Sequence, residues 1–149
     1  MSTYRGNCHC GAVGFEYQTQ QPVGDWFVRR CECSFCAKHG AIYTSDPAGS
    51  LHFTHKDPTA LARYRFGHKT ADFVFCSRCG GYLGAIMEEG GQELFVMNIR
   101  ALDPQPEGLP PAKDMTYEEE TTESRVTRRA SRWTPIVPAN PRNMSSRGS

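Results

Sequence analysis

The seven cysteines of this 149-residue chain lie in three short clusters, and this grouping constrains the fold more than any other feature of the sequence. The clusters are Cys8-His9-Cys10, Cys31-Glu32-Cys33-Ser34-Phe35-Cys36 and Cys76-Ser77-Arg78-Cys79. Thiolates are preferred ligands of zinc, which takes four protein donors in structural sites and three plus an open position in catalytic ones. Seven thiols divide into four plus three, so the sequence predicts two zinc ions per chain.

A disulfide framework fits the same cysteines poorly. An odd number of cysteines leaves one thiol unpaired, and the C-x-C spacing is too short for an easy bridge within a cluster. No apolar run approaches the roughly 18 residues of a membrane-spanning helix, and the first residues lack the apolar core of a signal peptide. We therefore expect a cytoplasmic protein, because thiols stay reduced in that compartment.

The charge balance argues against two classes of partner. Seventeen Lys and Arg residues and sixteen Asp and Glu residues leave a formal net charge of +1 at pH 7. A nearly neutral chain carries no strong field for nucleic acid or for a membrane surface. We therefore expect neither nucleic-acid binding nor membrane binding.

Short apolar segments separated by turn residues recur through the first hundred residues. Aromatic and β-branched residues alternate within these segments, and Gly, Pro, Asp and Ser separate them. No long stretch with a 3.6-residue period occurs before residue 100. The pattern predicts an all-β sheet assembly with few short helical turns. The expected strands span residues 12–17, 25–33, 41–44, 51–54, 61–66, 72–75, 82–87 and 93–99.

Two further segments bear on the organisation of the chain. We expect one helical turn at residues 34–38, capped by Ser34. Segment 103–113 carries four prolines, which predicts a zinc-binding β domain over residues 1–102 and a partly packed C-terminal extension over residues 103–149. Segment 115–129 fits either a short helix or a disordered stretch, and the last ten residues are expected to be disordered.

The spacing of the first and last clusters suits one shared tetrahedral site. Residues at i and i+2 point to the same face of a strand, so Cys8 and Cys10 can aim their sulfur atoms together. Cys76 and Cys79 lie in a tight turn whose following glycines allow positive φ angles. These four cysteines predict a structural zinc. An alternative, which the spacing leaves open, is a two-knuckle ribbon of Cys33, Cys36, Cys76 and Cys79.

Cys31, Cys33 and Cys36 then form a second zinc site with an open fourth position. Three thiolates leave a zinc site with a charge of −1, which tolerates one more anionic ligand, whereas four thiolates leave −2. The basic neighbours in sequence are Arg29, Arg30 and Lys38. A purely structural site remains an alternative, with the fourth ligand supplied by His9, His39 or Glu32.

The ordered motifs C-x-C-G, C-x-C-x-x-C and C-x-x-C-G resemble those of the glutathione-dependent formaldehyde-activating enzyme family, also called the centromere-protein-V domain family. The matching segments are CHCGAV at residues 8–13, CECSFCAK at 31–38, LARY at 61–64 and FCSRCG at 75–80. The resemblance covers about residues 5–100 and includes all seven cysteines in order and spacing.

This resemblance implies an all-β, Mss4-like fold with two zinc ions. It implies a structural zinc on Cys8, Cys10, Cys76 and Cys79, and a more labile zinc on Cys31, Cys33 and Cys36. The implied activity is carbon–sulfur lyase chemistry, which makes and breaks S-hydroxymethylglutathione from formaldehyde and glutathione. Three departures at the implied active site bear on the substrate pair: Glu32 replaces a common His, Ala37 replaces a common Arg, and segment 37–40 is one residue shorter.

Other residues receive plainer expectations. His39, three residues after the second cluster, is a possible acid–base group, although an exposed loop histidine is the simpler interpretation. Glu32 is expected to be solvated or salt-bridged. The residues expected at the surface are His52, His55 and His68, and those expected in a solvated tail are Arg128, Arg129 and Arg132. The aromatic residues expected in the core are Tyr64, Phe66, Phe73, Phe75 and Phe95. Whether Trp26 and Phe27 wall a pocket stays open.

Three functions fit these features. In the first, the chain is an enzyme whose second zinc activates a small thiol, such as glutathione, or a small aldehyde. In the second, it is a non-catalytic zinc-binding interaction module with a closed second site. In the third, it is a thiol or metal sensor that releases zinc from Cys31, Cys33 and Cys36 on oxidation. We take the enzyme as the leading hypothesis.

Overall fold

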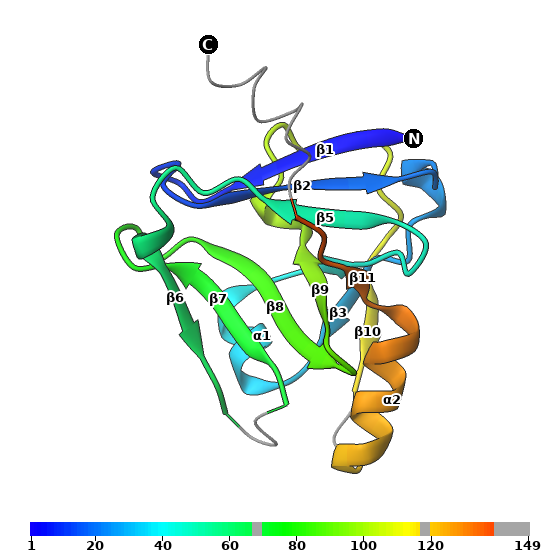
Figure 1. Cartoon of the computed structure of the whole chain (residues 1–149). Coiled ribbons are helices and arrows are strands. Elements are labelled where there is room, and N and C mark those ends of the chain that lie inside the picture. The colour runs from blue at the N-terminus through cyan, green and yellow to red at the C-terminus, as the bar shows by residue number, and fades with distance from the viewer. Residues whose placement is uncertain (67–69, 117–119, 139–149) are drawn as a thin grey trace.

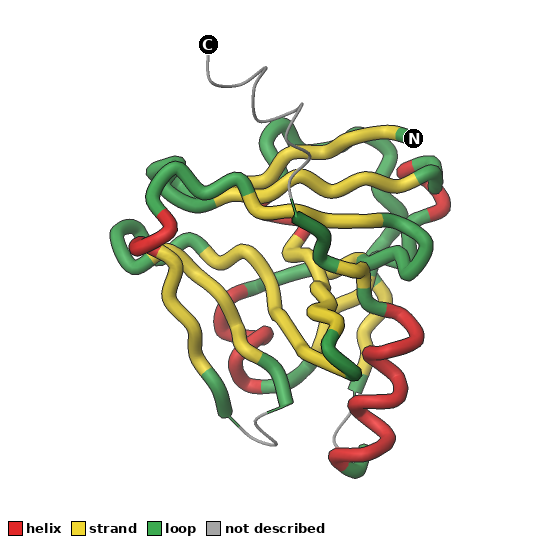
Figure 2. The backbone as a smooth tube through the Cα atoms, viewed as in Figure 1, coloured by secondary structure: helices red, strands yellow, loops and turns green. Residues whose placement is uncertain are grey.

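The computed structural model describes residues 1–66, 70–116 and 120–138, and strands dominate it (Figures 1 and 2). The strands are β1 Ser2–Asn7, β2 Gly14–Thr19, β3 Arg29–Cys31, β4 Tyr43–Thr44, β5 Ser50–Phe53, β6 Leu61–Tyr64, β7 Asp72–Cys76, β8 Tyr82–Glu89, β9 Gln92–Asn98, β10 Lys113–Met115 and β11 Thr134–Pro135. The helices are α1 Ser34–His39 and α2 Thr122–Arg132, and short 3-10 turns span Val23–Asp25, Pro58–Ala60 and Ile99–Ala101. The predicted all-β architecture with few helical elements is confirmed.

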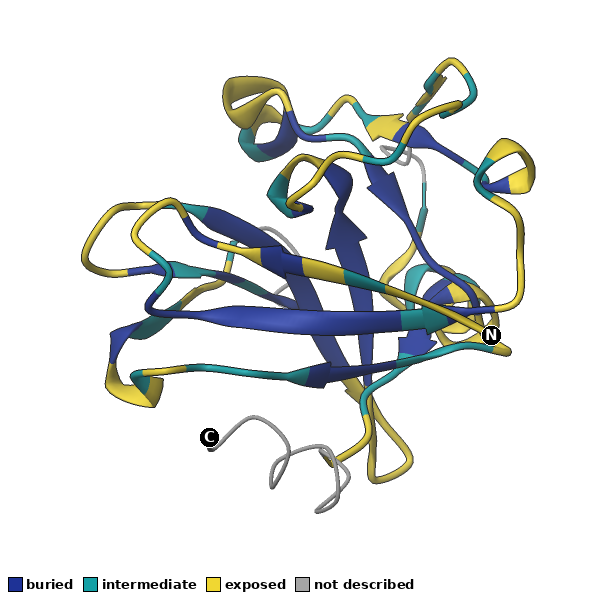
Figure 3. Cartoon of the chain, turned by 90° about the horizontal axis from the view of Figure 1, so that it is seen from above, coloured by how far each residue is buried: buried dark blue, intermediate teal, exposed yellow. Residues whose placement is uncertain are grey.

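The strands form two sheets that pack against each other. A three-stranded antiparallel sheet has the order β1-β2-β5, and an eight-stranded sheet follows the path β10-β3-β4-β9-β8-β7-β6, with β11 paired to β9. In Figure 1 the smaller sheet lies across the upper end of the larger one. Figure 3 shows that the burial is concentrated in the strands that face each other, whereas the turns between them are exposed.

Aromatic rings fill the space between the two sheets. Phe15 of β2 and Phe95 of β9 are fully buried, with ring centroids 5.8 Å apart, and Phe53 of β5 lies 5.6 Å from Phe95. Gly84 of β8 leaves room for Phe95, because a Cβ there would lie 2.6 Å from the ring. Burial of each of these aromatic side chains stabilises the folded state by about 1.5–3 kcal/mol, so this contact helps to hold the two sheets together.

A second apolar cluster forms on the other side of the larger sheet. It contains Cys36, Tyr43, Tyr82, Val96 and Trp133, all buried. Helix α1 and helix α2 both contribute to it, although they are far apart in sequence. This cluster, rather than the core between the sheets, surrounds the second cysteine group.

The strand predictions are confirmed in position, with shifts of a few residues at most ends. The expected strand at 25–33 is much shorter, since a 3-10 turn occupies Val23–Asp25 and β3 covers only Arg29–Cys31. The sequence did not predict β1, whose residues are mostly exposed and so lack a clear alternating pattern. The helical turn at 34–38 is confirmed, but Cys33 caps it rather than Ser34.

Several single-residue expectations are wrong. His52 is 4 % exposed, because β5 pairs with β2 and its ring there lies against the buried carboxylate of Glu16, with 3.1 Å between Nε2 and Oε2. Tyr64 is 49 % exposed, since β6 is the edge strand of its sheet. Phe95 is buried as expected. His55 is half-buried and His68 lies outside the described residues.

The C-terminal part of the chain packs onto the larger sheet. β10 pairs in parallel with β3, and β11 pairs with β9. Helix α2 begins after Thr121, whose side chain accepts a hydrogen bond from Ser124 N at 3.0 Å, and it contacts β8. The helical alternative for this segment is therefore confirmed. The domain division at residue 102 stays a prediction, and residues 139–149 lie outside the described range. Among the described residues no helix is long and apolar enough to cross a membrane.

Candidate metal centres and the adjoining cavity

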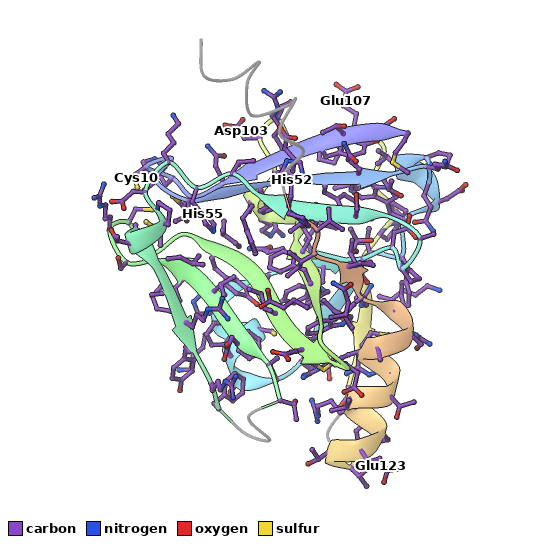
Figure 4. The ribbon with its side chains drawn as sticks, in the orientation of Figure 1. Cys10, His52, His55, Asp103, Glu107 and Glu123 are labelled. Carbon is purple, nitrogen blue, oxygen red and sulfur yellow. The ribbon has the colours of Figure 1, made fainter. Side chains whose placement is uncertain are left out.

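Four cysteines converge where the turn after β1 meets the turn between β7 and β8. Cys8 and Cys10 follow β1, Cys76 ends β7, and Cys79 lies just before β8. Their ligand atoms all lie within 4.8 Å of one another, and Cys10 Sγ is 3.7 Å from both Cys8 Sγ and Cys76 Sγ. Figure 4 shows Cys10 at this end of the molecule. The fold thus brings the first and last cysteine clusters together.

Backbone N–H groups surround these sulfur atoms. Val13 N lies 3.4 Å from Cys8 Sγ, and Arg78 N lies 3.3 Å from Cys76 Sγ. Backbone N–H groups at Cys10 and Gly81 lower the pKa of the Cys79 thiol to about 6. Donors of this kind favour the thiolate, which is the form that binds a metal ion.

Glycines allow the two turns to approach. Gly11 and Gly80 have φ angles of +83° and +77°, a region that side-chain-bearing residues rarely adopt. At Gly81 the constraint is the close approach itself, because a Cβ there would lie 2.8 Å from Cys8 Cβ. The C-G pairs in the motifs are therefore explained by local backbone geometry.

The other three cysteines meet where a strand end is followed by a helix start. Cys31 ends β3, Cys33 caps α1, and Cys36 lies in the first turn of α1. Cys36 N donates a hydrogen bond to Cys33 Sγ at 3.4 Å, and the three sulfur atoms lie within 4.8 Å of one another. The sequence predicted that one regular strand would contain both Cys31 and Cys33, but β3 ends at Cys31. The cap geometry of α1 brings their sulfur atoms together instead.

The three thiols share negative charge. Hydrogen bonding from Cys31 and then Cys36 lowers the pKa of Cys33, whereas bonding toward Cys31 and Cys33 raises the pKa of Cys36. In physical terms one thiolate is stabilised by two neighbouring thiols, and loss of a further proton would place like charges side by side. A divalent cation would remove that repulsion.

Both groups suit zinc by donor chemistry and spacing. Zinc–sulfur bonds of about 2.3 Å in a tetrahedron place neighbouring sulfur atoms about 3.8 Å apart. The 3.7 Å separations in the four-cysteine group match this value. The cysteines divide four plus three, so the ribbon alternative is wrong. Among the described residues no histidine or carboxylate joins the group of three.

A cavity of about 190 Å³ opens beside the group of three cysteines. Its described lining is mainly apolar, with several arginines and no carboxylate. The lining residues are Arg29, Cys31, Cys33, Cys36, Tyr43, Phe66, Thr70, Ala71, Phe73, Ala85, Val96, Arg125, Arg128, Arg129 and Trp133. The second cysteine group is thus accessible to a small molecule.

The basic residues around this cavity differ from those expected. Arg29 lines it and is buried, donating to Ser45 Oγ at 2.7 Å, whereas Arg30 is paired with Asp114 at 2.9 Å. Lys38 is exposed and does not line the cavity. Arg128 and Arg129 were expected to be solvated, which is wrong, because both line the cavity from α2. Arg132 is exposed, as expected.

His39 and the neighbouring aromatic residues form a stack beside α1. The His39 ring is exposed, lies 4.2 Å from the Phe35 ring, and its Nδ1 is 2.9 Å from the Phe35 carbonyl oxygen. His39 does not line the cavity, so its position gives no support to an acid–base role. The Phe73 ring is tilted against Phe35, with ring centroids 4.5 Å apart, and it does line the cavity.

Several remaining expectations have clear outcomes. Trp26 is buried against Tyr4 and Tyr17 and does not line the cavity, so it is a core residue. Phe27 is half-buried and likewise does not line the cavity. Glu32 is exposed, as expected. Three aromatic residues expected in the core are only half-buried, namely Phe66, Phe73 and Phe75.

Comparison with known proteins agrees with this geometry. The family model described as "Glutathione-dependent formaldehyde-activating enzyme" matches residues 3–119, a span that contains all seven cysteines. The chain belongs to the glutathione-dependent formaldehyde-activating enzyme family. A crystal structure of a Rhodobacter sphaeroides protein is similar to this family member, with 32 % sequence identity and a TM-score of 0.58. The match covers 74 % of this chain and 99 % of that protein.

Sequence reasoning missed a hydrogen-bonded tyrosine pair in this member of the formaldehyde-activating family. Tyr43 Oη lies 3.0 Å from Cys36 Sγ and 2.8 Å from Tyr82 Oη. Burial holds the pKa of both tyrosines well above the ordinary value, so both stay protonated at neutral pH. Tyr43 lies in a correctly predicted strand, but no local pattern in the sequence indicates which residue it will face.

Metal analysis tests the four-plus-three division. We expect about two zinc ions per chain. The four-cysteine group should hold its ion much more tightly, because four thiolate ligands bind zinc more strongly than three. Elemental analysis during slow chelation should show two phases. A single phase, or one ion per chain with three or more free thiols, would contradict the division.

Two serine variants test the different roles of the centres. Cys79→Ser breaks a clamp between distant turns and should lower Tm by on the order of 10 °C, since metal-binding energy is folding energy. Cys36→Ser loosens a local group and should lower Tm by about 2–3 °C. Thermal melting of both metal-loaded variants measures the difference. Equal losses would mean that both centres are structural.

Proposed function

We propose that this protein is a zinc-dependent carbon–sulfur lyase that joins or cleaves a small thiol and an aldehyde beside Cys31, Cys33 and Cys36. The single observation that supports it best is a small cavity that opens onto three convergent cysteines. A site with three protein ligands keeps one position for a substrate. Family membership adds glutathione and formaldehyde as the first substrate pair to test.

Two zinc ions fit the proposed division of labour. Cys8, Cys10, Cys76 and Cys79 would hold the structural ion, and Cys31, Cys33 and Cys36 the reactive one. When bound there, the second ion would act as a Lewis acid that favours the thiolate form of a substrate or polarises a carbonyl group.

The proposed reaction needs no oxidant or reductant. The thiol sulfur bonds to the carbonyl carbon, the carbonyl π electrons move to oxygen, and the thiol proton ends on that oxygen, which gives a hemithioacetal. The reverse steps cleave the carbon–sulfur bond. Ala71, Phe73, Ala85 and Val96 provide an apolar wall that strengthens polar interactions at the reacting atoms by excluding water.

Tyr43 is the side chain best suited to move the proton. It lines the cavity, contacts Cys36 Sγ, and is oriented by Tyr82. Its raised pKa keeps the hydroxyl protonated, so it can donate to an oxygen that gains negative charge. Apposition of two substrates within one small cavity adds a gain from proximity. We place the reaction in the cytoplasm, in keeping with reduced cysteines.

The decisive experiment combines X-ray absorption with turnover. With glutathione added, the sulfur count at zinc should rise, and the rise should grow with pH as the thiol ionises. Formaldehyde and glutathione should then form their adduct faster than in buffer. Cys36→Ser should abolish both effects while the structural zinc stays bound.

Two outcomes would contradict the lyase. An unchanged sulfur count with no acceleration indicates a closed second site, as expected of an interaction module. Zinc release on mild oxidation, without adduct formation, indicates a thiol or metal sensor.

Tyr43→Phe tests the proton-transfer role. We expect adduct formation to slow by on the order of 10²-fold, which is typical for loss of a general acid–base group, with zinc content unchanged. Tyr17→Phe is the matched control, because Tyr17 is buried but does not line the cavity. Equal rates in the two variants would remove Tyr43 from the mechanism.

A further inference from the structure

Helix α2 supplies part of the cavity wall although it lies outside the region that the family model matches. The match ends at residue 119, whereas α2 spans Thr122–Arg132. Arg125, Arg128 and Arg129 line the cavity from this helix, and Trp133 lines it directly after the helix ends. The cysteine centre therefore belongs to the shared family region, but the part of the wall formed by α2 and Trp133 does not.

The spacing on α2 explains why this wall exists. Residues 125, 129 and 133 follow one another at intervals of four, which places their side chains on one face of a helix. Trp133 is 5 % exposed and belongs to the apolar cluster that also contains Cys36. Burial of Trp133 holds the arginine-bearing face of α2 against the cavity.

Arg129 differs from the other arginines in the nature of its partners. It is 8 % exposed, Nη1 donates to Thr70 Oγ1 at 2.7 Å, and its guanidinium lies 5.0 Å from the Trp133 ring. Both partners are neutral. Within residues 1–66, 70–116 and 120–138, Arg129 Nε donates no hydrogen bond and Arg129 forms no ion pair. A buried cation without an anionic partner is costly.

The surroundings of Arg129 are short of negative charge. Burial, together with the neighbouring Arg128 and Arg125, lowers the pKa of its guanidinium to about 10, and the negative charges of Glu120 and Cys31 offset this only in part. The carboxylate of Glu120 is held by Arg128 in a bidentate pair, at 2.8 and 3.1 Å. An anion in the cavity would give Arg129 the charged partner that the described protein residues do not provide.

We propose that Arg129 binds a carboxylate of the substrate and so selects small thiols that carry an acid group. The planar guanidinium matches a carboxylate in a bidentate arrangement. The cavity of about 190 Å³ has room for a small thiol that carries an acid group. This inference rests on the proposed function, because it assigns the class of the thiol substrate.

The test compares two small thiols on protein with Zn²⁺ in the four-cysteine group and Co²⁺ in the three-cysteine group. The probes are 3-mercaptopropionate and 2-mercaptoethanol, and the readout is the thiolate-to-cobalt absorption band. Charge-assisted hydrogen bonds contribute about 1.5–3 kcal/mol, which corresponds to at least about tenfold in affinity. We expect Arg129→Gln to reduce the preference for the acid by about tenfold, with 2-mercaptoethanol binding unchanged.

Arg132→Gln is the matched control, because it removes one positive charge from the same helix at an exposed position outside the cavity. It should keep the wild-type preference. If Arg129→Gln is unstable, Arg129→Lys keeps the charge but loses the bidentate geometry, and it should still reduce the preference severalfold. An equal preference in wild type and both Arg129 variants would overturn the inference.

A separate arm distinguishes failure of the inference from failure of the proposed function. If both thiols bind cobalt equally well in every variant, the open site stands and the carboxylate site falls. If neither thiol changes the band, the lyase proposal fails. Propionate, followed through the NMR signal of the Trp133 indole N–H, then decides the carboxylate site by itself. A shift that Arg129→Gln removes supports it, and the absence of a shift overturns it.

Discussion

Convergence of Cys8, Cys10, Cys76 and Cys79 is the constraint on which the rest of the arrangement depends. These residues bring the turn after β1 to the turn between β7 and β8, so a metal ion bound to them would hold the smaller sheet against the larger one. The close approach requires Gly81, since a side chain there would collide with Cys8. In a chain of this size the core between the sheets is modest, and a metal clamp would add folding energy that burial alone supplies sparingly.

The second cysteine group is built differently. Its cysteines come from one local segment, so they contribute little to holding distant strands together. The residues packed around them come from distant parts of the chain: Tyr43 from β4, Tyr82 from β8 and Trp133 after α2. An ion with three local ligands and a cavity at its side suits reactivity, whereas an ion with four ligands that link two turns suits stability.

The family model ends before α2 begins, so the reaction type and the choice of substrate can be considered separately. The cysteine centre bears on the reaction type, and it lies within residues 3–119. The part of the cavity wall formed by α2, which includes Arg129, would bear on which molecule is held. Members of one fold commonly change substrate through such peripheral segments while the central chemistry is retained.

The sequence by itself determined the all-β class, the approximate strand positions and the three cysteine clusters, because alternation and ligand spacing are local properties of the chain. Only the tertiary structure decided that the first and last clusters meet while the middle cluster lies apart from them. The same holds for the burial of His52, the exposure of Tyr64 and the contact of Tyr43 with Cys36. The tertiary structure also decided that Arg129, which the charge pattern placed in a solvated tail, faces the second centre. Each of these outcomes depends on pairing or packing between segments far apart in sequence, and no local periodicity encodes which distant segment a residue will meet.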